Sequence, residues 1–83
     1  MMIAVKVKFF AVARDLVGKG ELMLSVPEKN SVADVFELLA SSHPRLQEWK
    51  QHLQFAVNQQ YVSSHTILHD DDEVAVIPPV SGG

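Results

Sequence analysis

The feature that most constrains this chain is its last apolar segment, which runs into two prolines close to the C-terminus. Residues 73–77 (EVAVI) read as a strand, and Pro78-Pro79 follows directly. Proline has a fixed φ and lacks an amide hydrogen, so hydrogen bonding to a neighbouring strand should stop there. We therefore expect a sheet whose final strand ends at Ile77.

Residues 80–83 (VSGG) follow the prolines and finish on two glycines. Fully extended, they reach about 13 Å, at about 3.3 Å per residue. Gly83 has no Cβ beside its α-carboxylate and Gly82 adds no bulk, so this end can enter a narrow channel with its carbonyl carbon open to attack. A frayed chain end is the plain alternative, because most termini are disordered. The Pro-Pro pair favours a presented, flexible tail at 80–83.

Two alternating segments near the N-terminus predict a pair of strands. Over residues 3–9, apolar side chains recur at every second position, and lysines between them mark the solvent face. Phe10 then falls on that solvent face. Residues 22–26 alternate in the same way and stop at a proline. We expect these strands to form a hairpin, joined by an irregular connection over residues 11–20, in which two glycines permit positive φ.

A helix should begin after Ser31. Ser31 and Asp34 have the spacing of a capping box, in which each side chain accepts a hydrogen bond from the other residue's backbone. The helix should end at His43-Pro44, because a residue before proline avoids the helical region. Four apolar residues at i, i+3, i+4 and i+7 form one stripe that should pack on a sheet: Val32, Val35, Phe36 and Leu39.

The second half of the chain predicts further short elements. A short helical piece is expected over residues 46–53, a strand from Phe55, a turn at 58–60 and a return strand at 61–62. An acidic turn at 70–72 leads into the last strand, which we place in the centre of the sheet beside the first. The order predicts an α+β fold, a mixed sheet with one main helix across one face, which is the β-grasp pattern of ubiquitin-like domains.

Composition sets limits on this interpretation. The chain has 83 residues, of which 47% are hydrophobic and 20% charged, and we expect a single domain over residues 1–83. It has no cysteine, no apolar stretch long enough to cross a membrane and no leader pattern, which fits a cytoplasmic protein. A net charge of −3 argues against binding to nucleic acid.

No internal active site is suggested by the titratable residues. His65 and His69 are four residues apart in a segment that reads as loop or strand, where this spacing does not converge on a metal. The acidic run from Asp70 lacks the ligand spacing of a calcium loop. We expect no metal site and no bound cofactor.

The face of the sheet opposite the helix is a candidate docking surface. By alternation it should carry five apolar residues: Phe10, Ala56, Tyr61, Ala75 and Ile77. A cluster of exposed apolar side chains next to a presented tail favours partner binding. The alternative is that loops or Trp49 cover these residues.

The sequence also resembles a known family, the small subunit of molybdopterin synthase. The residues that carry the resemblance are Phe9-Phe10-Ala11, Arg14, Gly18, 56–59, 72–75 and, above all, the ending 78–83. Sulfur carriers of the thiamin pathway are similar in fold and in the terminal glycines, but they usually lack the two prolines.

This resemblance implies a non-catalytic sulfur carrier that works with two partners. An ATP-dependent adenylyltransferase of the ubiquitin-activating type would adenylate the Gly83 carboxylate, and sulfur would replace the adenylate to give a thiocarboxylate. The tail would enter the large catalytic subunit, where the sulfur passes to a cyclic pterin precursor, in a heterotetramer of two large and two small subunits. Gly82, which has no side chain, would let the tail enter a narrow channel. The residues expected to contact partners are Phe10, Tyr61, Ile77, Pro78, Pro79, Val80 and Ser81.

Two positions depart from that family, and other functions stay open. Many relatives have glycine where this chain has Asp71, and a more aromatic pair where it has Val76-Ile77. Asp tolerates positive φ at modest cost. The alternatives are a ubiquitin-like modifier that forms isopeptide bonds to lysines, a sulfur carrier for thiamin or another thiolated product, and a binding domain whose tail is idle.

Overall fold

The computed structural model describes residues 1–79. The predicted tail, residues 80–83, lies outside the described residues. The described residues form five strands, three α-helices and one 3₁₀ helix. In order, they are β1 (Met2–Phe9), α1 (Ala11–Val17), β2 (Glu21–Pro27), α2 (Val32–Ser42), α3 (Arg45–Trp49), η1 (Lys50–His52), β3 (Gln54–Val57), β4 (Gln60–Val62) and β5 (Glu73–Ile77).

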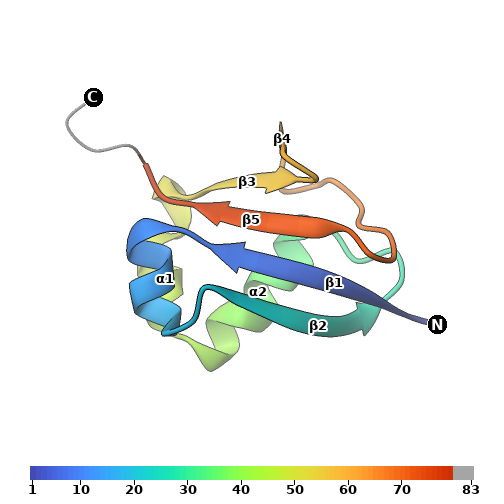
Figure 1. Cartoon of the computed structure of the whole chain (residues 1–83), viewed down its shortest axis with the longest axis horizontal. Coiled ribbons are helices and arrows are strands. Elements are labelled where there is room, and N and C mark those ends of the chain that lie inside the picture. Colours follow the sequence, from blue (N-terminus) through green and yellow to red (C-terminus); the bar gives the residue numbers. More distant parts are fainter. Residues whose placement is uncertain (80–83) are drawn as a thin grey trace.

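The strands form one mixed sheet in the order β2-β1-β5-β3-β4, with the helices against one face (Figure 1). The first strand is antiparallel to β2 and parallel to β5, and β5 is antiparallel to β3. The last strand is therefore central and lies beside the first, which confirms the predicted β-grasp arrangement. Since β5 is hydrogen-bonded on both sides, its C-terminal end is anchored by strands from both halves of the chain.

The hydrophobic core lies between the sheet and α2. From β1 and β5, alternate residues point into it, and Val5, Val7, Val74 and Val76 are all buried. The predicted stripe of α2 covers them, and its four residues are buried: Val32, Val35, Phe36 and Leu39. Trp49 packs against this core. It therefore does not cover the apolar residues on the opposite face of the sheet, which was one of the alternatives that the sequence left open.

The start of α2 has the predicted capping box. The Asp34 backbone N–H donates to Ser31 Oγ at 3.2 Å, and the Ser31 backbone N–H donates to Asp34 Oδ2 at 2.9 Å. These bonds satisfy two backbone donors that a helix start would otherwise leave unpaired. The helix ends at Ser42, one residue before the cap His43, as the following proline requires.

Residues 11–20 are not the irregular connection that we predicted. Ala11–Val17 is α1, with Ala13 buried and two further apolar residues packed on the core. Gly18 ends this helix in the left-handed conformation, at φ 86°, and of the two glycines only it has positive φ. The glycines and the shortness of the segment obscured the spacing of Ala13, Leu16 and Val17, which lie on one helical face.

Two turns without glycine set the geometry around β5. Asn58 and Gln59 have φ of 51° and 73°, as a two-residue hairpin turn with the twist of its strands requires. Gln60 already belongs to β4, so our predicted turn was one residue too long. Asp71 has φ 70°, so this aspartate adopts the positive φ that we expected it to tolerate in the turn.

The side chains of Asn58 and Asp72 tie these turns together. Asn58 Nδ2 donates to Asp72 Oδ1 at 2.9 Å, and the Glu73 backbone N–H donates to Asn58 Oδ1 at 3.0 Å. The other carboxylate oxygen of Asp72 accepts the His69 backbone N–H at 2.8 Å. The start of β5 is thus held in register with β3.

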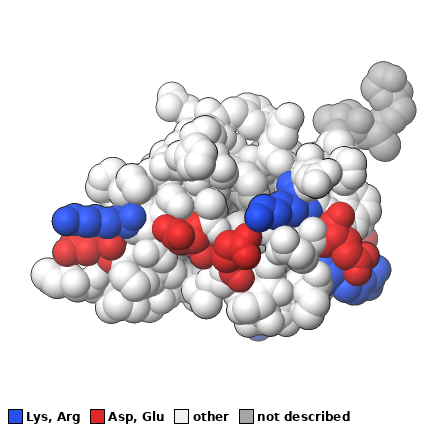
Figure 2. Space-filling model, turned by 180° about the vertical axis from the view of Figure 1, so that it is seen from behind, with Lys and Arg blue, Asp and Glu red and all other residues white. Residues whose placement is uncertain are grey.

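Charged side chains of both signs lie in a band across the helix side of the molecule, and the upper part of that view, over β3 and β4, carries neither (Figure 2). Among residues 1–79, no helix has the length and apolar character that a membrane crossing needs.

Replacing Ser31 by Ala should lower the free energy of unfolding by about 1 kcal/mol, because it removes the side-chain half of the capping box. Chemical denaturation monitored by circular dichroism measures this change. Ser41→Ala, at an exposed position inside α2, is the matched control and should be neutral or slightly stabilising, since alanine favours helix. Equal losses in the two variants would contradict the importance of the cap.

Candidate functional site

The face of the sheet opposite the helices carries the candidate site. One row of side chains crosses all five strands on this face, because the strand register places Tyr61, Ala56, Ala75, Lys8 and Glu21 side by side. Strands in a sheet are about 4.8 Å apart, so the two ends of this row are about 19 Å apart. The β4 end is apolar and the β2 end is charged.

Three of the predicted contact residues lie around the apolar end. Tyr61 is 68% exposed and Phe10 is 47% exposed, while Ile77 is partly buried. Phe10 follows β1 with an extended backbone (φ −118°, ψ 151°), so the alternation of β1 continues for one more residue. Its backbone N–H donates to Val76 O at 3.3 Å. Phe9 of β1 pairs with Val76 of β5, and continuing this parallel register by one residue places Phe10 beside Ile77.

The two alanines of the row form the floor between Tyr61 and Ile77. Ala56 lies on the predicted face but is only 4% exposed, so it is not the exposed apolar residue that we expected. It is small and sits between β4 and β5, where its larger neighbours shield it. Gln54 pairs with Ile77 and belongs to the same surface. Sequence patterning gave no signal for Gln54, because it is polar.

The chain leaves the sheet next to this surface. β5 ends at Ile77, as the two prolines predict; Pro78 is buried, whereas Pro79 is exposed. Pro78 therefore anchors the base of the predicted tail on the domain. The remaining predicted site residues, Val80, Ser81, Gly82 and Gly83, lie outside the described residues.

Ion pairs occupy the other half of this face. Lys8 Nζ lies 3.5 Å from Glu73 Oε2, and Lys6 Nζ lies 3.9 Å from Glu21 Oε2. All four side chains are partly exposed, so each pair contributes little to stability. These pairs separate a charged region over β1 and β2 from an apolar surface over β3, β5 and Phe10. We call this apolar surface the tail-base patch and define it by six residues: Phe10, Gln54, Ala56, Tyr61, Ala75 and Ile77.

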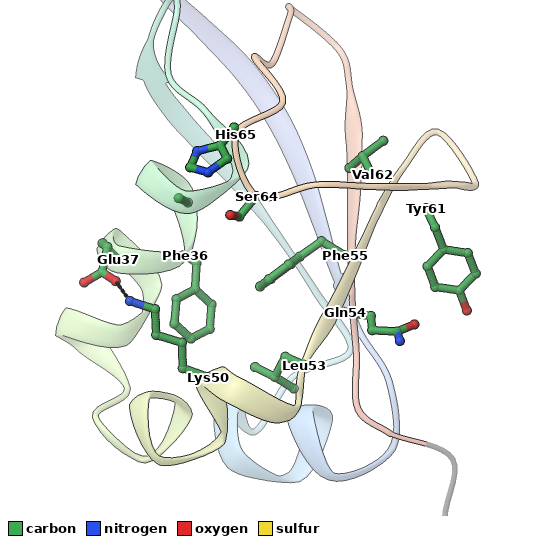
Figure 3. A pocket seen from close by; sticks show the side chains of 11 residues that line it. Phe36, Glu37, Lys50, Leu53, Gln54, Phe55, Tyr61, Val62, Ser64 and His65 are labelled. Atoms are coloured by element: carbon green, nitrogen blue, oxygen red, sulfur yellow. Dashed lines mark hydrogen bonds and ion pairs between the residues drawn. The ribbon is translucent and has the colours of Figure 1, made fainter. Parts of the chain in front are cut away.

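An open cavity of about 860 Å³ lies on the helix side, between α2 and the β3–β4 edge. Figure 3 shows Phe36 and Phe55 next to each other in it and Lys50 reaching across to Glu37. The two rings meet edge to face, with their centroids 5.6 Å apart. The Lys50 Nζ to Glu37 Oε1 distance is 2.9 Å. Tyr61 points away from Phe55, toward the other side of the sheet. This cavity depends on how α2 packs on the sheet, so no local sequence pattern indicates it.

The histidines and aspartates of the segment before β5 bind the backbone or face solvent in the structure. Within residues 1–79, no group of three or more histidine or acidic side chains has the geometry to hold an ion. His69 Nδ1 lies 3.9 Å from Asp72 Oδ2, and the imidazole is mostly exposed. Asp70 Oδ1 accepts the Ala4 backbone N–H at 2.8 Å. These two carboxylates therefore bind the backbone, where they hold the turn before β5.

The central parallel pair, the helix across one face and the terminal segment leaving the central strand define the class as a ubiquitin-like β-grasp protein. The ThiS family model matches residues 7–83. The chain belongs to the ThiS family.

Curated relatives agree over nearly the whole chain. The molybdopterin synthase sulfur carrier subunit of Arabidopsis thaliana is 35% identical, with 98% of this chain and 84% of that protein covered. The protein of the same name from Mycobacterium tuberculosis is 36% identical, with 99% and 100% covered. The chain is thus a homologue of molybdopterin synthase sulfur carrier subunits, as its sequence resemblance predicted.

Solved structures give the same fold. A Pyrococcus furiosus protein assigned as subunit 1 of molybdopterin converting factor has a TM-score of 0.84 at 36% identity, covering 94% of this chain and 99% of that one. Small archaeal modifier protein 1 of Methanosarcina acetivorans has 0.82 at 32% identity, covering 100% and 99%. A chain in the complex of subunits 1 and 2 of the Helicobacter pylori factor has 0.67 at 25% identity, covering all of both chains.

Replacing Tyr61 by Ala should change the free energy of unfolding by less than about 0.5 kcal/mol, because the ring is largely exposed. Phe36→Ala, in the core on the other side of the sheet, should cost about 3–5 kcal/mol. Urea titrations of the two variants measure both values. A large loss for Tyr61→Ala would mean that the ring supports the fold and would weaken its assignment to docking.

Proposed function

We propose that this chain is the sulfur carrier subunit of a molybdopterin synthase. The observation that carries the proposal is the full-length homology to sulfur carrier subunits together with the ending Pro-Pro-Val-Ser-Gly-Gly on a central strand. The subunit would supply no catalytic side chain of its own. Its contribution would be the α-carboxylate of Gly83, delivered on a short arm from a rigid base.

The chemistry begins at a carboxylate, which is a poor electrophile. An ATP-dependent adenylyltransferase of the ubiquitin-activating type would join the Gly83 carboxylate to AMP with release of pyrophosphate. A sulfur donor would then displace AMP and leave a thiocarboxylate. That sulfur is a soft nucleophile, and its attack on a cyclic pterin precursor would give a thioester between the carrier and the pterin. Water would then hydrolyse the bond between the Gly83 carbonyl carbon and the sulfur, which leaves the sulfur on the pterin and regenerates the carboxylate. Glycine suits this end of the chain because no Cβ crowds the reacting carbon.

The tail-base patch would dock on the large catalytic subunit. Phe10 and Tyr61 are exposed aromatic residues, a type enriched in interfaces, and they flank a floor of small side chains next to the point where β5 ends. Buried Pro78 would fix the direction in which the arm starts. A solved complex of subunits 1 and 2 of the Helicobacter pylori factor supports such a pairing. We propose a heterotetramer of two large and two small subunits, in the cytoplasm.

A ubiquitin-like modifier is the second candidate, favoured by the 32% identity to small archaeal modifier protein 1 of Methanosarcina acetivorans. Here the adenylated Gly83 would form an isopeptide bond to a lysine of another protein. Both functions use the same activated carboxylate, so the terminal residues alone do not separate them. A sulfur carrier for thiamin or another thiolated product would also share this activation.

Deleting Gly83 should abolish sulfur transfer and leave the melting temperature unchanged, because the buried core that the structure describes is built from residues between Ile3 and Val76. Intact mass spectrometry of the protein from cells with the pathway present should show a fraction heavier by one sulfur in place of one oxygen. That fraction should be absent from the deletion variant. Met2→Ala, at an exposed position on β1, is the control and should carry sulfur normally.

Ladders of lysine conjugates, with only free carboxylate on the carrier, would redirect the proposal to protein modification. Substantial sulfur transfer by the variant that lacks Gly83 would contradict the mechanism.

Replacing Ile77 by Asp should weaken binding to the large subunit at least about tenfold, a change of about 1.4 kcal/mol. A charge in the middle of the tail-base patch would have to be desolvated on docking. Isothermal titration calorimetry measures the affinity, with circular dichroism to check the fold. Met2→Asp places the same charge on the same face but outside the patch and should bind normally. Unchanged affinity in Ile77→Asp would exclude the patch from the interface.

A further inference from the structure

The outer edge of β2 carries hydrogen-bonding groups that no strand within residues 1–79 uses, since β2 ends the sheet. Hydrogen bonds at both ends of the β1–β2 ladder identify these groups. The Phe9 N–H donates to Gly20 O at 2.9 Å, and the Glu28 N–H donates to Met1 O at 2.9 Å. Bonded and non-bonded pairs alternate along an antiparallel ladder. Leu22, Leu24 and Val26 therefore bond to β1, and Glu21, Met23 and Ser25 direct their N–H and C=O groups outward. Pro27 lacks an N–H, and its carbonyl accepts the Asn30 N–H at 3.4 Å.

Side chains along this edge are unusually apolar for an open strand. Natural edge strands are commonly protected by charges, by proline or by shortness. β2 is seven residues long and has a charge only at its first residue, Glu21, and a proline only at its last, Pro27. Between these ends, Leu22 and Leu24 are half-buried and Met23 is 61% exposed. The other edge of the sheet, β4, has only three residues.

The flank of α2 beside β2 is also apolar. Ala33, Phe36 and Glu37 line the cavity toward β3 and β4, so the opposite flank of the helix faces the β2 side. Successive residues of a helix turn by about 100°, which places Leu38 on that opposite flank. Leu38 is 46% exposed. The β2 edge is therefore bordered by exposed apolar side chains on both faces of the sheet, Met23 on one and Leu38 on the other.

We propose that two copies of this chain pair through the β2 edge, in antiparallel orientation about a two-fold axis at Leu24. In this register Met23 of one copy faces Ser25 of its partner. Both residues point their N–H and C=O groups outward, so the two equivalent pairs form four backbone hydrogen bonds. Leu24 meets its own counterpart in a non-hydrogen-bonded pair on the helix side.

The edge is complementary to itself in pattern as well as in hydrogen bonding. Leu22 of one copy lies opposite Val26 of the partner, so apolar side chains face each other along the helix side. Glu21 lies opposite Pro27, so within the strand no charge opposes a like charge. Because the two β2 strands pair with each other, neither has an open edge in the dimer, and the two five-stranded sheets join into one sheet of ten strands. Pairing along one strand buries a small area, so association should be weak and concentration-dependent.

This surface is separate from the tail-base patch, which lies over β3 and β5 with Phe10 and Tyr61. A dimer through β2 leaves that patch accessible. The inference therefore stands whether or not the proposed sulfur-carrier function is correct.

Engineered cysteines test the register directly, because the chain has no cysteine of its own. In the proposed dimer the two Leu24 Cα atoms are about 4.5 Å apart, within the range that a disulfide bridges. Leu24→Cys should oxidise almost completely to a covalent dimer at millimolar concentration. Met23→Cys is the matched control, since its two copies are offset by two residues and lie beyond about 7 Å. Preferential cross-linking at position 23 would overturn this register.

The unmodified protein provides a second test that does not depend on a variant folding. Amide hydrogen exchange followed by NMR should slow several-fold for Met23 and Ser25 on going from micromolar to millimolar protein. The amides of Leu22 and Leu24, which already bond to β1, should be protected throughout. Sedimentation equilibrium should show a dimer at the higher concentration, and Met23→Lys should abolish it. A monomer at all concentrations, or a dimer that persists in Met23→Lys, would overturn the proposal.

Discussion

The parallel pairing of β1 with β5 is the interaction on which the rest of the structure depends. It joins the two ends of the chain, with Lys6 opposite Glu73 and Phe9 opposite Val76. Each of these strands also pairs with one outer strand, so both halves of the sheet are connected through them. The point at which the terminal segment leaves the domain is consequently held by the whole core. A carrier of a reactive group at its C-terminus needs such a base, because a moving base would spread the positions that the group can reach.

The alternation of side chains in the central strands accounts for both the core and the candidate interface. Each strand residue that faces α2 has neighbours that face the opposite side. Val74 and Val76 belong to the core, whereas Ala75 and Ile77 belong to the tail-base patch. The core and the proposed docking surface thus use the same five-residue strand. Substitutions in the patch that leave the alternating core residues in place should leave stability unchanged, which separates an effect on the proposed docking from an effect on the fold.

The two surfaces that we infer lie on different parts of the sheet. The tail-base patch occupies β3, β5 and the residue after β1, while the proposed dimer uses the outer edge of β2. The ion pairs of Lys6 and Lys8 lie between them. A partner on the patch and a second copy on the edge would therefore not compete for side chains. Their recognition also differs physically, since the patch depends on apolar side chains and the edge on backbone hydrogen bonds.

The sequence by itself determined the strands, the start and end of α2 and the face that each strand buries. These features are local: a capping box spans three residues, and alternation is visible along one strand. It did not reveal α1, whose apolar spacing is short and bordered by glycines. Only the tertiary structure decided the register of β3 on β5 and the packing of α2, and with them the burial of Ala56 and Pro78, the place of Gln54 beside Ile77 and the cavity next to Phe55. Those properties depend on the register between segments far apart in the chain, which no local pattern specifies.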